Sequence, residues 1–121
     1  MKKLIAAALL LAPVAASADY VDVIEFKLKD GCEFSTYMAI VKDFIAYAKD
    51  LGYQTEIAVK LLHPVPTTHL WLGRSANAKT FGKAWDTYRA ALSDPASTPY
   101  KLQQRFDACN EIVSRRSYDS Y

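Results

Sequence analysis

The chain has 121 residues, of which 15 are Lys or Arg and 13 are Asp or Glu. This length is enough for one domain with a single modest core. The positive and negative charges are interspersed along the chain, a pattern that does not indicate a nucleic-acid footprint or a preference for anionic membranes. We therefore expect neither nucleic acid nor a membrane surface among the partners.

The first 18 residues match the three parts of a secretory signal peptide. Lys2 and Lys3 precede an apolar run over residues 4–12, and the small residues 16–18 supply a cleavage site. The run is shorter than the roughly 20 residues that a membrane-spanning helix needs. Cleavage after Ala18 leaves 103 of the 121 residues, and without the two lysines these carry 13 basic and 13 acidic side chains. We expect residues 19–121 to form one periplasmic or secreted domain that is not attached to a membrane.

Hydrophobic periodicity divides the rest of the chain into alternating strands and amphipathic helices. The expected elements are a strand over residues 20–28, a helix over 33–51, a hairpin over 53–75, a helix that ends before Pro95, a short helix that runs to Cys109 and a strand over 111–118. This order is the split βαβ or ferredoxin-like arrangement, an α+β fold in which helices cover one face of an antiparallel sheet.

Capping residues mark the expected helix ends. Gly52 closes the first helix, Ser75 or Asn77 caps the second, and Thr98 caps the third. The polar tail over residues 117–121 is expected to fray.

Strand alternation assigns the side chains of the sheet to two unlike faces. The residues expected to face the helices are Ile24, Phe26, Ile57, Val59, Leu70 and Leu72. The opposite face then carries Val23, Glu25, Lys27, Glu56, Lys60, His69, Trp71 and one of Arg115 or Arg116. Alternation does not decide between the two arginines.

Two cysteines, Cys32 and Cys109, lie after the predicted signal peptide, and an even number in an exported chain favours a disulfide. Free buried thiols are the alternative, and a metal site is disfavoured because neither has a second Cys or His at ligand spacing. In a ferredoxin-like sheet the last strand pairs antiparallel with the first. Cys32 follows the first strand and Cys109 precedes the last, so the topology brings them together. Such a bridge is worth about 4 kcal/mol.

The element order and the long helix after the first strand resemble the dimeric α/β-barrel superfamily, which includes antibiotic-biosynthesis-monooxygenase-like domains. The resemblance covers nearly all of residues 20–118 and contains no diagnostic motif. It implies a homodimer in which two sheets pack together, with a ligand cavity between each sheet and its helices or at the sheet interface. The short third helix and the secretion signal depart from the simplest members.

The polar face around Trp71 is the candidate ligand site. Mixed charge near a tryptophan suits a polar ligand, with Arg or Lys holding an anion and the indole stacking on a planar group. The candidate ligand-binding residues are Glu25, Lys60, His69, Trp71, Arg115 and Arg116. The alternative is a lattice of ion pairs that solvates the sheet or lines a dimer interface.

His63 and His69 flank the turn of the hairpin, and two imidazoles alone form an incomplete metal site. We expect no metal and no cofactor, with proton transfer or haem ligation as alternatives for these residues. The sequence has no Ser-His-Asp order, Gly-rich phosphate loop, HExxH or EF-hand pattern.

These observations predict an exported protein that binds a small molecule or has an accessory role. One alternative, implied by the resemblance, is a monooxygenase-like or haem-degrading enzyme, which predicts a roofed cavity with His69 or a tyrosine pointing into it. The other is an interaction module with an exposed sheet edge, which places Trp71 or the C-terminal tyrosines in a flat apolar patch.

Overall fold

The computed structural model describes residues 19–62 and 68–121. The predicted signal peptide and His63 lie outside the described residues. In chain order the elements are β1 (Asp19–Leu28), α1 (Phe34–Ala48), the short 3₁₀ helix η1 (Lys49–Leu51), β2 (Gln54–Val59), β3 (His69–Ser75), α2 (Ala78–Ala91), α3 (Thr98–Cys109) and β4 (Asn110–Ser120). Within the described ranges, no helix combines the length and apolar character needed to cross a membrane.

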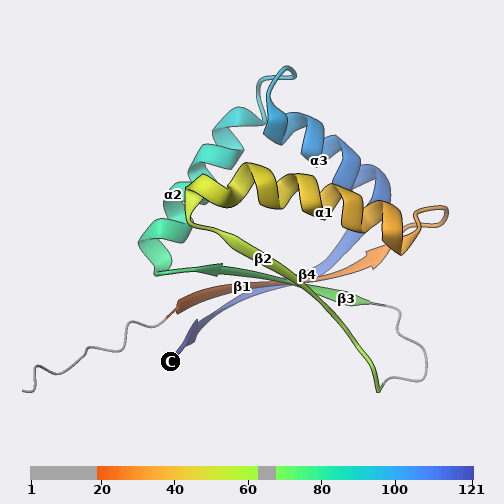
Figure 1. The fold of residues 1–121 in the computed structure, drawn as a ribbon, viewed down its shortest axis with the longest axis horizontal. Coiled ribbons are helices and arrows are strands. Elements are labelled where there is room, and N and C mark those ends of the chain that lie inside the picture. Colours follow the sequence, from red (N-terminus) through yellow and green to blue (C-terminus); the bar gives the residue numbers. More distant parts are fainter. Residues whose placement is uncertain (1–18, 63–67) are drawn as a thin grey trace, which may run out of the picture.

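The four strands form one sheet in the order β2-β3-β1-β4, and every neighbouring pair is antiparallel. Helices α1, α2 and α3 lie together on one side of this sheet (Figure 1). We call that side the helix face and the other side the outer face. The arrangement confirms the predicted α+β ferredoxin-like fold.

The ends of the elements follow local capping chemistry, with two corrections to the sequence prediction. Asn77 caps α2, because its side-chain oxygen accepts a hydrogen bond from the Thr80 N–H at 2.8 Å. Ser97, not Thr98, caps α3, and its hydroxyl accepts from the Tyr100 N–H. The expected fraying of the tail is also wrong, because β4 stays paired with β1 as far as Ser120.

Large side chains from the sheet, α1 and α3 meet in a core on the helix face. The buried cluster consists of Phe26, Tyr37, Ile40, Val41, Trp71, Leu102, Phe106 and Cys109. Aromatic rings supply much of its volume, and they meet mostly edge to face or tilted, the arrangements that aromatic pairs prefer.

The register of the sheet reverses the predicted orientation of β3. Trp71 stands opposite Ile24 on β1 and Ile57 on β2, and directly opposed residues of antiparallel strands share a face. His69 likewise stands opposite Phe26. Trp71 and His69 therefore lie on the helix face, while Leu70 and Leu72 lie on the outer face. Sequence alternation did not identify the buried face of β3 because this strand carries large side chains at both its odd-numbered and its even-numbered positions.

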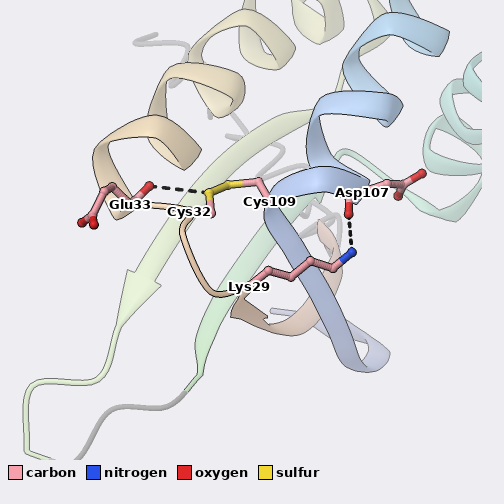
Figure 2. The surroundings of a disulfide bond; sticks show 5 residues. All are labelled: Lys29, Cys32, Glu33, Asp107 and Cys109. Carbon is pink, nitrogen blue, oxygen red and sulfur yellow. Dashed lines mark hydrogen bonds between the residues drawn. A yellow bond between two sulfur atoms is a disulfide. The ribbon is translucent and has the colours of Figure 1, made fainter.

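A disulfide joins Cys32 to Cys109, whose Cα atoms are 5.2 Å apart (Figure 2). It links the loop after β1 to the last residue of α3. Lys29 reinforces the link, since its N–H donates to the Cys109 carbonyl at 2.9 Å and its ammonium group donates to the Asp107 carbonyl at 2.5 Å. The last carbonyls of a helix have no partner within the helix, and Lys29 supplies one for these two.

Candidate functional site

A cavity of about 350 Å³ lies between the helix face of the sheet and the helices. This volume falls in the range of small-molecule sites, roughly 300 to 1,000 Å³. The cavity is predominantly aromatic, and its aromatic lining consists of Phe26, Tyr37, Phe44, Tyr47, Tyr53, Trp71, Phe81, Trp85, Tyr88 and Phe106. Such a lining binds apolar or aromatic surface more readily than a hydrated ion.

Phe44 of α1 lies where aromatic residues from three other parts of the chain converge. Its ring centroid is 5.0 Å from that of Trp71 and 5.9 Å from that of Tyr88. The Phe106 ring of α3 lies 6.1 Å away. Because these contacts fix the rings relative to one another, the packing defines the shape of the cavity wall.

One wall of the cavity carries an ion pair between β1 and β4. The Asp22 side chain is only 2% exposed, and its two oxygens accept from Arg115 Nε at 2.9 Å and from Arg115 Nη2 at 2.6 Å. Burial alone lowers the pKa of Arg115, but the hydrogen bonds and charge of Asp22 outweigh it and raise the pKa. The guanidinium carbon lies 4.3 Å from the ring centroid of Trp85, which places the cation against an aromatic face.

Tyr53 connects this ion pair to Trp71. Its hydroxyl donates to Asp22 Oδ2 at 3.1 Å and accepts from Trp71 Nε1 at 2.9 Å. Burial, followed by the charge of Asp22, raises the pKa of Tyr53, so the phenol stays protonated at neutral pH. We call Trp71, Tyr53, Asp22 and Arg115 the polar array.

Gly73 makes room for the polar array. A Cβ atom at this position would lie 1.8 Å from the hydroxyl oxygen of Tyr53. Any side chain at position 73 therefore competes for the space that the phenol occupies between Trp71 and Asp22.

A second polar group lies where the cavity opens. The Tyr88 hydroxyl donates to Gln103 at 2.9 Å, and Gln103 donates to the Asp107 carboxylate at 2.7 Å. Burial raises the pKa of Tyr88 to about 12. Asp107 and Ile112 are exposed lining residues at the end of α3 and in β4, so the cavity opens along this edge of the molecule.

No protein-family model matches the chain, and no curated protein matches its sequence. Among solved structures, the chain is similar to SnoaB, a cofactor-independent oxygenase from Streptomyces nogalater. The TM-score is 0.59, with 8% identity over 86% of this chain and 94% of that chain. It is also similar to a conserved protein of unknown function from Bacteroides thetaiotaomicron, described as a possible oxidoreductase, with a TM-score of 0.56 and 7% identity over 86% and 99% of the two chains.

The hydroxynitrile lyase from Passiflora edulis matches with a TM-score of 0.50 and 18% identity over 84% of this chain and 94% of that chain. The likeness to these three proteins lies in the fold. The chain has a ferredoxin-like fold that resembles the folds of these three proteins.

In this fold the six predicted ligand-binding residues do not form one site. Trp71 and Arg115 lie on the helix face and line the cavity. Arg116 stands opposite Val23 and lies on the outer face with Glu25 and Lys60. Because Trp71 is 7% exposed, it belongs to no exposed apolar patch.

Glu25 and Lys60 belong to a polar network on the outer face. Glu25 accepts a hydrogen bond from Thr68 at 2.8 Å and lies 3.5 Å from the Lys60 ammonium nitrogen. The Thr68 hydrogen bond, followed by the hydrogen bond and charge of Lys60, lowers the pKa of Glu25 despite some desolvation. Ser114 of β4 extends the network with a 3.4 Å hydrogen bond to Glu25. The predicted alternative of a polar lattice thus applies to this part of the outer face.

His69 lies on the helix face but is not among the described residues that line the cavity. Its ring is 5.6 Å from that of Phe26 and 5.2 Å from that of Phe34. Its buried Nδ1 atom has no hydrogen-bond partner in the part of the chain that the structure describes. Residues 19–62 and 68–121 also contain no cluster of three or more His, Cys, Asp or Glu side chains suited to holding a metal ion.

Asp22 is the residue of the polar array that sequence reasoning missed. A signal for Asp22 was present, because it has the same strand parity as Ile24 and Phe26 and so falls on the face assigned to the core. A carboxylate at such a position needs a buried partner. No short-range pattern identified that partner, since Arg115 lies 93 residues away.

Proposed function

We propose that this chain is an exported protein that binds a small, largely apolar aromatic molecule in the cavity between the sheet and the helices. The observation that carries this proposal is the combination of an aromatic lining with one polar wall. Ligand sites commonly have this composition, in which apolar contacts supply affinity and a few fixed polar groups orient the ligand.

The size of the cavity supports a ligand rather than imperfect packing. Protein interiors are close-packed and contain few voids larger than a water molecule. Here a much larger space is bounded by rings that contact one another and by the ion pair of Asp22 and Arg115, which two hydrogen bonds join. Side chains that could collapse into the space, such as Trp85, are instead held in place against Arg115.

Export is the second part of the proposal. It is supported by the match of residues 1–18 to a signal peptide and by the disulfide between Cys32 and Cys109. Structural disulfides persist mainly in oxidising compartments such as the bacterial periplasm.

Binding can be tested with N-phenylnaphthylamine, an uncharged aromatic dye that becomes fluorescent in apolar surroundings. We expect the protein to bind the dye, and Ala84→Phe to abolish binding because Ala84 is a buried lining residue of α2. The matched control is Ala90→Phe, since Ala90 is exposed on the same helix. Circular dichroism checks that both variants fold. Binding that Ala84→Phe leaves intact, or no binding to the wild type, refutes the cavity as a ligand site.

An oxygenase is the second candidate function. The observation that favours it is the polar array, which puts the fixed donors of Arg115 beside an aromatic cavity in a fold shared with a cofactor-independent oxygenase. Oxygen uptake in the presence of naphthol tests it, with Ala84→Phe as the control that closes the cavity. Uptake equal in the wild type and this variant eliminates the candidate.

We also propose that a second copy of the chain covers the outer face. Val21, Val23, Leu70 and Leu72 give this face an apolar strip, and the fold resemblance implies face-to-face packing of two sheets. Analytical ultracentrifugation should show a dimer that Leu72→Glu dissociates. Leu62→Glu is the control, because Leu62 is fully exposed on the hairpin. A monomeric wild type, or a dimer that survives Leu72→Glu, contradicts this proposal.

A further inference from the structure

The cavity has few charged lining residues, and they differ in whether an opposite charge lies beside them. Among the described residues that line it, Arg115 is the only cation and Asp107 is the only anion. The ligand's own charge must therefore be matched to these two groups. Their surroundings decide which sign of ligand charge the cavity accepts.

Arg115 presents little net positive charge to the cavity. The Asp22 carboxylate receives two of its N–H groups at 2.9 and 2.6 Å, and at such distances an opposite charge cancels most of the field felt farther away. Asp22 itself is not among the described lining residues, whereas Arg115 and Tyr53, which both bond to it, are. The Nη1 group of Arg115 makes no hydrogen bond to the described residues, which leaves it free to donate to a neutral acceptor.

Asp107 gives the opening of the cavity a negative charge. Its carboxylate accepts from the neutral amide of Gln103, and the nearby Lys29 ammonium bonds to the backbone carbonyl of Asp107. No salt bridge joins this carboxylate to a cation in the described residues. Binding of an anion in the cavity is therefore unfavourable. The anion loses its hydration, is repelled by the Asp107 carboxylate at the opening, and gains no unpaired cation as a partner inside.

We infer that the cavity selects uncharged aromatic ligands over anionic ones, and that Asp22 is the residue that determines this specificity by cancelling the charge of Arg115. The favoured ligand carries a neutral acceptor, such as a carbonyl or hydroxyl oxygen, toward Arg115. This inference rests on the proposed function, and it replaces the expectation that an arginine of the site holds an anion.

Two dyes that share a ring skeleton provide the test. N-phenylnaphthylamine is uncharged, and anilinonaphthalene sulfonate is the same molecule with an added sulfonate. We expect the wild type to bind the uncharged dye at least about tenfold more tightly. In Asp22→Asn the charge of Arg115 is no longer cancelled, and the preference should shift toward the sulfonate by about tenfold or more.

Two further variants separate charge from other effects of substitution. The double variant Asp22→Asn with Arg115→Gln removes both charges and should restore the wild-type preference. Asp107→Lys changes an exposed residue, so it should fold, and it should shift the preference toward the sulfonate by a second route. Sulfonate binding that persists in Ala84→Phe lies outside the cavity and is subtracted.

The outcomes distinguish this inference from the proposed function. If the wild type binds the sulfonate more tightly within the cavity, or if folded Asp22→Asn keeps the wild-type ratio, the charge selectivity is overturned while cavity binding stands. If Asp22→Asn does not fold, an unchanged ratio in Asp107→Lys overturns it equally. If neither dye enters the cavity, the proposed function fails and the selectivity fails with it.

Discussion

Replacing Gly73 with Ala tests the geometry on which the polar array depends. Gly73 stands opposite Asp22 in the sheet, and the Tyr53 ring lies directly over it. An added Cβ would lie 1.8 Å from the Tyr53 hydroxyl oxygen and 2.1 Å from the ring carbon that bears it. These distances are far shorter than a van der Waals contact, so the phenol has to move.

The cost follows from what the movement breaks. Overpacking a filled site costs about 1 to 3 kcal/mol. The displaced phenol also loses its bond from Trp71, worth about 1 kcal/mol, and its bond to the Asp22 carboxylate, worth about 1.5 to 3 kcal/mol. These effects overlap, and we expect Gly73→Ala to lower the free energy of unfolding by about 3 to 5 kcal/mol.

Urea denaturation of the wild type, Gly73→Ala, Tyr53→Ala and the double variant measures this cost and assigns its cause. In a Tyr53→Ala background the added methyl meets no phenol, and Gly73→Ala should then cost less than about 1 kcal/mol or stabilise slightly, because alanine restricts the unfolded chain. The coupling between the two substitutions should therefore be at least about 2 kcal/mol. A cost that is equal in both backgrounds would refute the placement of Tyr53 over Gly73.

Three further predictions concern stability. Replacing both Cys32 and Cys109 with Ser should lower the free energy of unfolding by about 4 kcal/mol, because the bridge closes a loop across 77 positions, and reduction of the wild type should give the same loss in urea denaturation. Burial raises the pKa values of Tyr37, Tyr53 and Tyr88, so their contribution to stability is complete below the ordinary phenol pKa of about 10 and is lost as the pH rises through the pKa values of the folded state. Between pH 10 and 12 the protein should unfold as tyrosinate absorbance appears. A free energy of unfolding that does not change over that range contradicts this prediction. The pKa of Glu25 is lowered, so the contribution of its carboxylate to stability is present above the ordinary pKa of 4.5 and is lost as the pH falls through the lowered pKa. In Glu25→Gln the melting temperature should therefore fall less steeply at acidic pH than in the wild type. An identical fall in both proteins would count against the Thr68 and Lys60 contacts.

The element order was predictable because each element has its own hydrophobic periodicity and is bounded by capping or turn residues. Helix α1 shows a repeat at three and four residues and ends near Gly52, whose φ of 68° is the left-handed conformation that glycine adopts readily. The position of the two cysteines at the same end of the antiparallel β1–β4 pair then followed from topology alone. These inferences use only local sequence and one rule of connectivity.

The face of β3 was not predictable in the same way. Leu70 and Leu72 alternate with His69 and Trp71, so both faces of the strand carry side chains that can be buried. The choice depends on neighbours distant in sequence, because Trp71 fits an aromatic group that contains Phe44 and Phe106 and finds its hydrogen-bond partner in Tyr53. Hydrophobicity alone ranks the leucines first and selects the wrong parity.

A β-bulge explains why alternation could not choose between Arg115 and Arg116. The pairing of β1 with β4 shifts between Glu25 and Phe26, which face Ser114 and Ile112, so Val113 is the additional residue. Counting from Ile112 by twos places Arg116 on the helix face, whereas the bulge moves Arg115 there. Bulges re-aim side chains in this way, and this one directs an arginine toward Asp22.

The disulfide and the cavity meet at the junction of α3 and β4. Cys109 ends α3, its neighbour Asn110 begins β4, and both Asn110 and Phe106 line the cavity. The bridge to Cys32 and the hydrogen bonds from Lys29 hold this junction against the end of β1 (Figure 2). The same junction sets where β4 starts, and together with the bulge at Val113 this start fixes the register that carries Arg115 to Asp22. The covalent link therefore supports the cavity as well as the fold, which is why the double Cys→Ser variant should bind N-phenylnaphthylamine more weakly even at temperatures where it remains folded.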